Sequence, residues 1–161
     1  MPSFKTVRPV RFTADEMFAL VADVEKYPQF VPLCESLVVR SREPGENGTH
    51  LIVATMGIGY KAIRESFTTR VDFDPAARSI VVSHMDGPFR RLENVWNFMP
   101  RGEAASDVAF AIDYEFRSPV LGLLMGSVFE TAFRRFSEAF EERAGLVYGV
   151  RRSPAGPAAT S

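Results

Sequence analysis

Residues 118–149, SPVLGLLMGSVFETAFRRFSEAFEERAGLVYG, decide the fold of this chain. Apolar side chains recur every three or four residues along the stretch, so they share one face of a helix. Ser118 can cap the first turn, Pro119 suits its first position, and Gly149 follows the last turn. We therefore predict one long amphipathic helix. Its apolar face would consist of Leu121, Leu124, Met125, Val128, Phe129, Ala132, Phe133, Phe136, Phe140 and Val147.

The preceding sequence consists mostly of short segments in which apolar and polar residues alternate, a pattern typical of half-buried strands. Within residues 107–116, for example, Val108 and Phe110 share one face. We expect a first strand over residues 4–10, a helix after the capping pattern at Thr13, and about six further antiparallel strands. This order predicts an α+β fold in which a curved antiparallel β-sheet wraps around the C-terminal helix.

The composition favours one globular domain. The chain has 161 residues, of which 46% are hydrophobic and 24% charged, and its net charge is -1. This balance gives no electrostatic drive toward DNA, and a single cysteine excludes an internal disulfide. We expect one domain over residues 1–149 and a disordered tail over 150–161. We also expect a cytoplasmic protein, either free or peripheral at the inner membrane.

Five blocks of the sequence carry a resemblance to a known family: DVEKYPQFVPLC (23–34), IRESFTTRV (63–71), DGPFRRLENVWNF (86–98), YEFRSPVLGLLMGSVFE (114–130) and AFEERAGLVYG (139–149). They resemble the corresponding blocks of the coenzyme Q-binding START-domain family. That family also includes bacterial RatA ribosome-association toxins and falls within the polyketide cyclase-like superfamily. The resemblance covers nearly the whole chain and implies the helix-grip fold of START-like and Bet v1-like proteins.

The resemblance implies a protein without catalytic activity that binds ubiquinone, or a related isoprenoid quinone or lipid, in a hydrophobic cavity. Ubiquinone would be the bound ligand, no cofactor would be required, and the protein would support respiratory electron transport or quinone synthesis. Transient contact with a membrane surface would fit this role.

Two other functions stay open. The first is that of a RatA-type toxin, which binds the large ribosomal subunit and blocks subunit association. A small basic patch for that contact could come from Lys61, Arg64, Arg90 and Arg91. The second is a polyketide aromatase or cyclase, which the shared fold permits but which needs acid–base residues in the cavity. Glu65 and Tyr114 are the candidates for that chemistry.

A cavity between sheet and helix would be mostly apolar, with a few polar groups that orient the ligand. Aromatic rings and thioethers could accommodate a quinone ring or an isoprenoid tail, although the same pattern also describes an ordinary core. Glu65 and Asn94 lie on otherwise apolar faces and could bind a quinone oxygen, or Glu65 could pair with an arginine at the mouth. The predicted apolar lining consists of Phe67, Val71, Trp96, Phe98, Phe110, Ile112, Tyr114, Met125, Phe129, Phe133 and Phe136.

The proline-containing segment after the first helix is a candidate loop at the cavity mouth. Its apolar residues could cover the cavity or contact a membrane interface, and a packed corner between helix and strand is the alternative. The residues concerned are Tyr27, Phe30, Val31, Pro32 and Leu33.

The cysteine and the histidines form no recognisable metal site or catalytic motif. Cys34 has no partner cysteine, so we expect it to be an inert packing residue. His50 follows a turn and should be exposed, whereas His84 lies at a strand end and should be a hydrogen-bonded edge residue.

Overall fold

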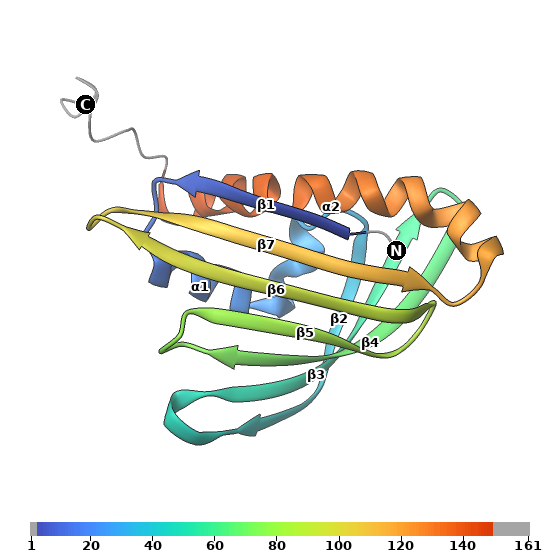
Figure 1. Cartoon of the computed structure of the whole chain (residues 1–161), viewed down its shortest axis with the longest axis horizontal. Coiled ribbons are helices and arrows are strands. Elements are labelled where there is room, and N and C mark those ends of the chain that lie inside the picture. Colours follow the sequence, from blue (N-terminus) through green and yellow to red (C-terminus); the bar gives the residue numbers. More distant parts are fainter. Residues whose placement is uncertain (1–2, 150–161) are drawn as a thin grey trace.

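The computed structural model describes residues 3–149 as a seven-stranded antiparallel sheet with a long helix lying along it (Figure 1). The strand order is β1-β7-β6-β5-β4-β3-β2, so only β1 departs from a simple meander. This arrangement confirms the predicted α+β helix-grip fold. The elements are β1 (Ser3–Val10), α1 (Ala14–Ala22), the 3₁₀ helix η1 (Val24–Gln29), β2 (Cys34–Pro44), the 3₁₀ turn η2 (Glu46–Gly48), β3 (His50–Tyr60), β4 (Ile63–Asp74), β5 (Ser79–Asp86), β6 (Phe89–Arg101), β7 (Ala105–Phe116) and α2 (Pro119–Tyr148).

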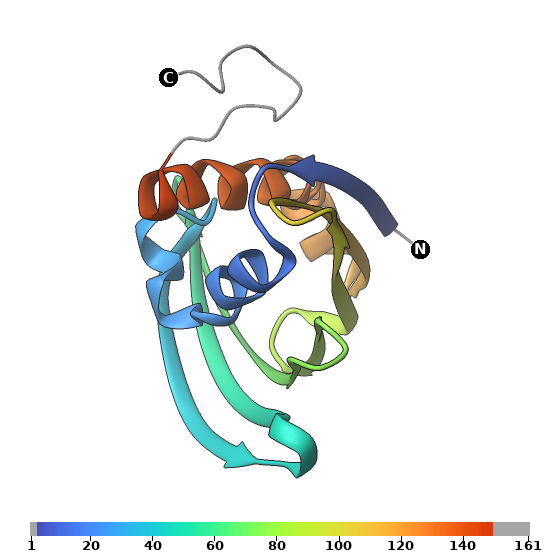
Figure 2. The same ribbon diagram turned by 90° about the vertical axis from the view of Figure 1, so that its left-hand side faces the viewer.

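The sheet curves around an interior that α2 and α1 cover. Figure 2 shows α2 lying across the open side of the curved sheet, with α1 in the opening at one end. The tight turn between β5 and β6 depends on Gly87, whose φ is 140°. A Cβ atom at Gly87 would lie 2.4 Å from the Cβ atom of Phe67, so only glycine fits there.

Helix α1 begins at the predicted capping box. The Thr13 hydroxyl accepts a hydrogen bond from the Glu16 amide at 3.0 Å, and the Glu16 carboxylate accepts one from the Thr13 amide at 2.9 Å. The Tyr148 hydroxyl donates to the Glu16 carbonyl oxygen at 3.0 Å and so joins the end of α2 to α1. These bonds hold α1 in place at this end of the interior.

Helix α2 begins as the sequence predicts, because the Ser118 hydroxyl accepts a hydrogen bond from the Leu121 amide and Pro119 is the first helical residue. The charged residues Glu130, Arg134, Glu138 and Glu142 of α2 are exposed. Arg8 on β1 pairs with Glu141 on α2 at 2.6 Å.

The predicted apolar face of α2 is wrong at two positions: the side chain of Leu124 is 59% exposed and that of Val147 is 51% exposed. Successive residues of an α-helix are about 100° apart, and the buried face rotates along α2 from Met125 to Ala144 and Tyr148. A twisted, curved sheet produces such a rotation, and it leaves Val147 outside the packed face.

The tail predicted over residues 150–161 lies outside the described residues. Among the helices within residues 3–149, none has the length and apolar character to span a membrane.

Candidate functional site

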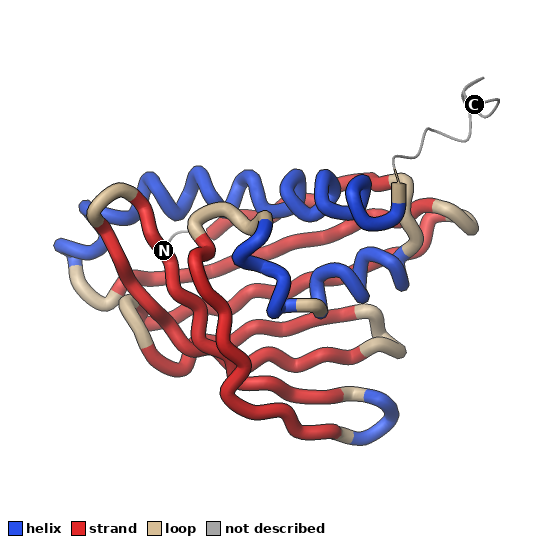
Figure 3. The backbone as a smooth tube through the Cα atoms, turned by 180° about the vertical axis from the view of Figure 1, so that it is seen from behind, coloured by secondary structure: helices blue, strands red, loops and turns tan. Residues whose placement is uncertain are grey.

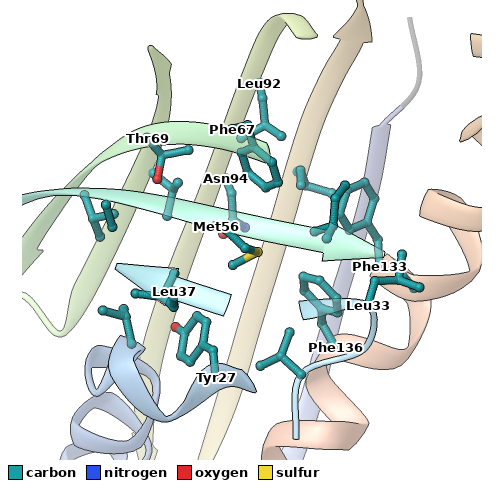
Figure 4. Close-up of a pocket in the computed structure, with 18 of the residues that line it drawn as sticks. Tyr27, Leu33, Leu37, Met56, Phe67, Thr69, Leu92, Asn94, Phe133 and Phe136 are labelled. Carbon is teal, nitrogen blue, oxygen red and sulfur yellow. The ribbon is translucent and has the colours of Figure 1, made fainter. Parts of the chain in front are cut away.

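An apolar cavity of about 100 Å³ lies between the inner face of the sheet, α2 and the segment that joins η1 to β2. Figure 3 shows η1 and α1 beneath α2, in front of the sheet. Figure 4 shows side chains from the strands, from η1 and from α2 pointing toward one another across the cavity. The cavity is thus built by elements that are far apart in the sequence.

Many predicted lining residues do face this cavity. Three sides contribute them: the central strands, β7 and the middle of α2. They are Phe67, Val71, Asn94, Trp96, Ile112, Phe129, Phe133 and Phe136.

Three predicted lining residues are buried in the core but lie away from the cavity. Phe98 packs against Phe18 of α1, with ring centroids 5.8 Å apart. Phe110 packs against the rings of Phe4 and Phe136. The ring centroids of Tyr114 and Phe133 are 5.0 Å apart. Strand alternation places all three on the inner face, but it cannot separate the part of that face under α1 or α2 from the part that lines the cavity.

Met125 and Glu65 also lie outside the main cavity. Met125 instead lines a much smaller pocket that shares Leu33, Ile58 and Phe129 with the cavity. The predicted pairing of Glu65 with an arginine is wrong within the described residues. The neighbouring Arg64 pairs with Glu35 at 3.1 Å instead.

Sequence reasoning missed the contribution of β2, β3 and β5 to the wall. The signal was present in residues 52–58, where every second side chain is apolar and points inward. Because β2 and β3 curve toward α2, they close the side of the cavity that a flat sheet would leave open. The missed lining residues are Val24, Leu37, Ala54, Met56, Ile58, Thr69, Ile80, Val82, Phe89, Leu92, Ala132 and Phe140.

The candidate mouth loop forms one wall of the cavity, so it both packs at a corner and covers the interior. Tyr27, Val31, Pro32 and Leu33 line the cavity. Phe30 does not, because its ring packs on the outer side, against α2. Leu33 adopts the left-handed backbone region, with φ of 69°, and its carbonyl oxygen accepts a hydrogen bond from the Gly59 amide at 3.0 Å.

The hydroxyl of Tyr27 is fixed by the protein itself. It donates a hydrogen bond to the Val21 carbonyl oxygen at 2.5 Å. Burial raises the pKa of this phenol far above its usual range, with smaller contributions from the nearby Cys34 and Asp23. Tyr27 therefore stays neutral and keeps its proton directed at the backbone.

Asn94 and Thr69 place polar groups in the apolar lining. Asn94 is 8% exposed, and its Nδ2 donates a hydrogen bond to the Ala111 carbonyl oxygen at 2.9 Å. Within residues 3–149, neither the Asn94 Oδ1 atom nor the Thr69 hydroxyl has a protein hydrogen-bond partner. Neither atom is among the fully buried side-chain atoms of the described residues that lack a hydrogen-bond partner, so both reach the open space of the cavity, where an oxygen or hydroxyl of a ligand could pair with them.

The remaining candidates lie outside the cavity. Cys34 is buried as expected, and burial raises the pKa of its thiol to about 11. His50 is not exposed but stacks on Phe73, with ring centroids 4.4 Å apart. His84 lies near the end of β5, as expected, but β5 has neighbouring strands on both sides, so His84 is not an edge residue. Its Nε2 atom is buried and has no hydrogen-bond partner among the described residues, and its ring contacts Phe89.

The predicted basic patch is partly neutralised by carboxylates. Arg90 lies 3.5 Å from Glu115, and Arg64 is engaged by Glu35 as described above. The ammonium of Lys61 lies over the ring of Tyr60, 5.3 Å from its centroid. Within residues 3–149, histidine, cysteine and carboxylate side chains form no group of three that could hold a metal ion.

Comparison with known proteins points to one family. The sequence pattern of the family described as polyketide cyclase/dehydrase and lipid transport matches residues 10–141. The ribosome association toxin RatA of Vibrio cholerae is 36% identical over 140 residues, which cover 87% of this chain and 93% of that protein. The mitochondrial coenzyme Q-binding protein COQ10 homolog B of Xenopus laevis is 28% identical over 92% of this chain and 60% of the frog protein.

Solved structures show the same architecture. An 18 kDa protein of Caulobacter crescentus is 35% identical, with a TM-score of 0.74, over 93% of this chain and all (100%) of that one. The Zhui aromatase/cyclase from a Streptomyces strain is 21% identical, with a TM-score of 0.71, over 96% of this chain and 98% of that one. At this lower identity the second likeness concerns the fold alone.

Proposed function

This chain belongs to the polyketide cyclase/dehydrase and lipid transport family, and from that premise we propose that it binds an isoprenoid quinone of the ubiquinone type without changing it chemically. The ligand would occupy the cavity under α2, and the protein would act as a carrier or chaperone in respiratory electron transport or quinone synthesis. The coenzyme Q-binding relative from Xenopus laevis supports this choice of ligand.

The character of the cavity is the observation that carries the proposal. Its wall is built from aliphatic and aromatic side chains, with Asn94 and Thr69 as isolated polar groups. Such a wall suits a ligand that is mostly hydrocarbon and carries a few oxygen atoms. Met56 and Phe136 are only partly buried and can adapt to a ring placed between them.

Binding would have to widen the cavity. Its volume of about 100 Å³ is smaller than the roughly 300–1,000 Å³ of typical small-molecule sites. The wall between η1 and β2 is a short loop rather than a regular element, so we expect α2 and this loop to separate when the ligand enters. The ligand would thereby select a more open conformation.

The lining offers little for acid–base catalysis. Its ionisable member is Tyr27, whose raised pKa and bond to Val21 keep the proton in place. Glu65 and Tyr114, the candidates for cyclase chemistry, do not line the cavity. We therefore propose binding rather than an aromatase or cyclase reaction.

Fluorescence of Trp96 provides a direct test. Trp96 is the single tryptophan of the chain and lines the cavity. A quinone in the cavity would quench its emission by accepting an electron from the excited indole ring. Titration with decylubiquinone, a ubiquinone analogue with a short saturated tail, should give saturable quenching at one ligand per protein. Unsaturable quenching, no stronger than that of free tryptophan, would contradict the proposal.

A blocked variant provides the control. Ala132 lies on α2 and lines the cavity, so the phenyl ring of Ala132→Phe should occupy the space that the ligand needs. Leu123 lies on the same helix but is 86% exposed, so Leu123→Phe adds the same ring without entering the cavity. Saturable quenching should be lost in the first variant and kept in the second.

Ribosome association is the second candidate function. It is supported by the 36% identity to the Vibrio cholerae RatA toxin over most of both chains. Exposed basic residues such as Lys61 and Arg90 could contact ribosomal RNA, although Glu115 offsets part of that charge. Ligand binding and ribosome association use different surfaces and are compatible.

Sedimentation profiles of ribosomes from cells that overproduce the protein would test the second candidate. A rise of free subunits at the expense of joined ribosomes would support it, and unchanged profiles would contradict it. Lys61→Glu combined with Arg90→Glu should abolish the rise while leaving the quenching of Trp96 by decylubiquinone intact.

A further inference from the structure

Asn94 is a polar residue in the middle of an apolar row. Leu92, Asn94 and Trp96 occupy every second position of β6 and so share its inner face, and all three line the cavity. The Nδ2 atom of Asn94 is held by the Ala111 carbonyl oxygen of β7. This bond fixes the amide plane and leaves the Oδ1 atom and one N–H without a protein partner among the described residues.

Thr69 adds a second polar group to the same wall. It lies on β4, and Asn94 lies on β6, with β5 between the two strands. Val82 of β5 pairs with Asn94 of β6 on one side and with Val71 of β4 on the other. Val71 is two residues from Thr69 on the same strand. Figure 4 shows Thr69 and Asn94 on the sheet side of the cavity, opposite Phe133 and Phe136 of α2.

The part of the cavity wall formed by Leu33, Ile58 and Phe129 is apolar. The small pocket beside it shares Leu33, Ile58 and Phe129 with the cavity and extends to Tyr60, whose side chain is partly exposed. A hydrocarbon chain can lie along this path without leaving a polar group unpaired. The polar end of a ligand therefore fits best at β4–β6, and its apolar end fits best near Tyr60.

We propose that Asn94 and Thr69 select ligands by hydrogen-bonding different carbonyl or hydroxyl oxygens of the headgroup, so that the headgroup lies against β4–β6 and the tail points toward Tyr60. This inference rests on the proposed function, since it concerns how the same cavity recognises its ligand. Asn94 can both donate and accept through its free N–H and Oδ1, and the Thr69 hydroxyl can do the same. Because β4 and β6 are about 10 Å apart, each group would bind a different oxygen of the headgroup, either a carbonyl of the quinone or a hydroxyl of its reduced form.

Two nearly isosteric variants test the roles of these groups. Asn94→Leu removes the amide and Thr69→Val removes the hydroxyl, while each keeps a side chain of similar size. Quenching of Trp96 measures the affinity for decylubiquinone, and displacement of that probe measures the affinity for decylbenzene, which has the tail and a ring but no oxygen. Thermal unfolding of each variant verifies that it folds.

We expect Asn94→Leu to weaken decylubiquinone binding by about three- to tenfold, the effect of losing one hydrogen bond. Thr69→Val should weaken it in the same direction, and neither variant should bind decylbenzene more weakly than the wild type. Equal affinity for decylubiquinone in the wild type and in both variants would overturn this inference. An equal loss for both ligands would also overturn it, because the residue would then act through cavity shape.

The wild-type titration separates this inference from the proposed function. Absence of saturable binding in the wild type would contradict the proposed function itself. Tight binding by the wild type with no effect of either substitution would contradict only the role of Asn94 and Thr69. If Asn94→Leu does not fold, Thr69→Val decides: weaker quinone binding supports the inference, and unchanged binding overturns it.

Discussion

Phe30 and Phe140 meet edge to face, with ring centroids 5.0 Å apart and ring planes at 89°. The same Phe140 ring contacts Tyr27 at 5.4 Å and Trp96 at 5.1 Å. Phe140 of α2 therefore contacts both the segment of Tyr27 and Phe30 and the sheet at Trp96, and it also lines the cavity. Aromatic pairs of this geometry add to the stabilisation that burial alone provides, so this contact holds the loop closed.

Replacing Phe140 should be severely destabilising. Phe140 is 1% exposed, and Phe140→Ala should lower the free energy of unfolding by about 3–5 kcal/mol. Phe30 is only half-buried and lies outside the cavity, so Phe30→Ala should cost about 1–2 kcal/mol. Urea unfolding of the two variants measures both values. An equal loss in the two variants would contradict the central position of Phe140.

The rotation of the buried face along α2 gives a second prediction. Leu124→Ala should change the free energy of unfolding by less than about 0.5 kcal/mol, because Leu124 is exposed. Phe129→Ala on the same helix should cost about 3–5 kcal/mol. Denaturant midpoints of the two variants provide the comparison. A large loss for Leu124→Ala would show that the start of α2 packs differently.

Local signals made the elements predictable. Ser118 and Pro119 mark the start of α2, and the reciprocal bonds of Thr13 and Glu16 mark the start of α1, because capping acts between near neighbours in the sequence. The helix-grip fold followed from these boundaries and from the resemblance to a known family, but the pairing of β1 with β7 was not predicted.

The composition of the cavity was only partly predictable, because it depends on how the sheet curves. Periodicity places Trp96 and Phe98 on one face, yet only Trp96 reaches the cavity, since α1 covers Phe98. Met56 has the right alternation but lies on β3, which joins the wall through curvature that no local pattern encodes. Thr69 also has the right alternation, but its hydroxyl gave no reason to expect it in an apolar wall.

Cys34 should be unreactive in the folded protein. Burial raises the pKa of its thiol to about 11, so at pH 8 only about one molecule in a thousand carries the reactive thiolate. Reaction with a chromogenic disulfide reagent should therefore be slow in buffer and fast in concentrated urea. Equal rates under the two conditions would contradict the buried position of Cys34.

His84 should make stability depend on pH. Burial lowers its pKa below the ordinary value of 6.5, and the nearby Asp86 opposes this shift only in part. Between the lowered pKa and 6.5 the unfolded chain binds more protons than the folded protein. The free energy of unfolding should therefore decrease as the pH falls through this range, and the loss should be complete below the lowered pKa.

The variant His84→Gln isolates this contribution from that of other titrating groups. Melting temperatures at about pH 7.5 and about pH 5.5 should differ more in the wild type than in the variant, because glutamine does not titrate. A loss on acidification that is equal or greater in the variant would contradict the burial of a neutral His84.

The central claim is that the cavity holds an isoprenoid quinone in the cell. It is tested most directly by mass spectrometry of an organic extract from protein purified without denaturation from a ubiquinone-making bacterium. The Ala132→Phe variant, purified alongside, is the control. We predict about one ubiquinone per wild-type molecule and almost none in the variant. An extract of the wild type without quinone, or with the same small amount as the variant, would contradict the claim.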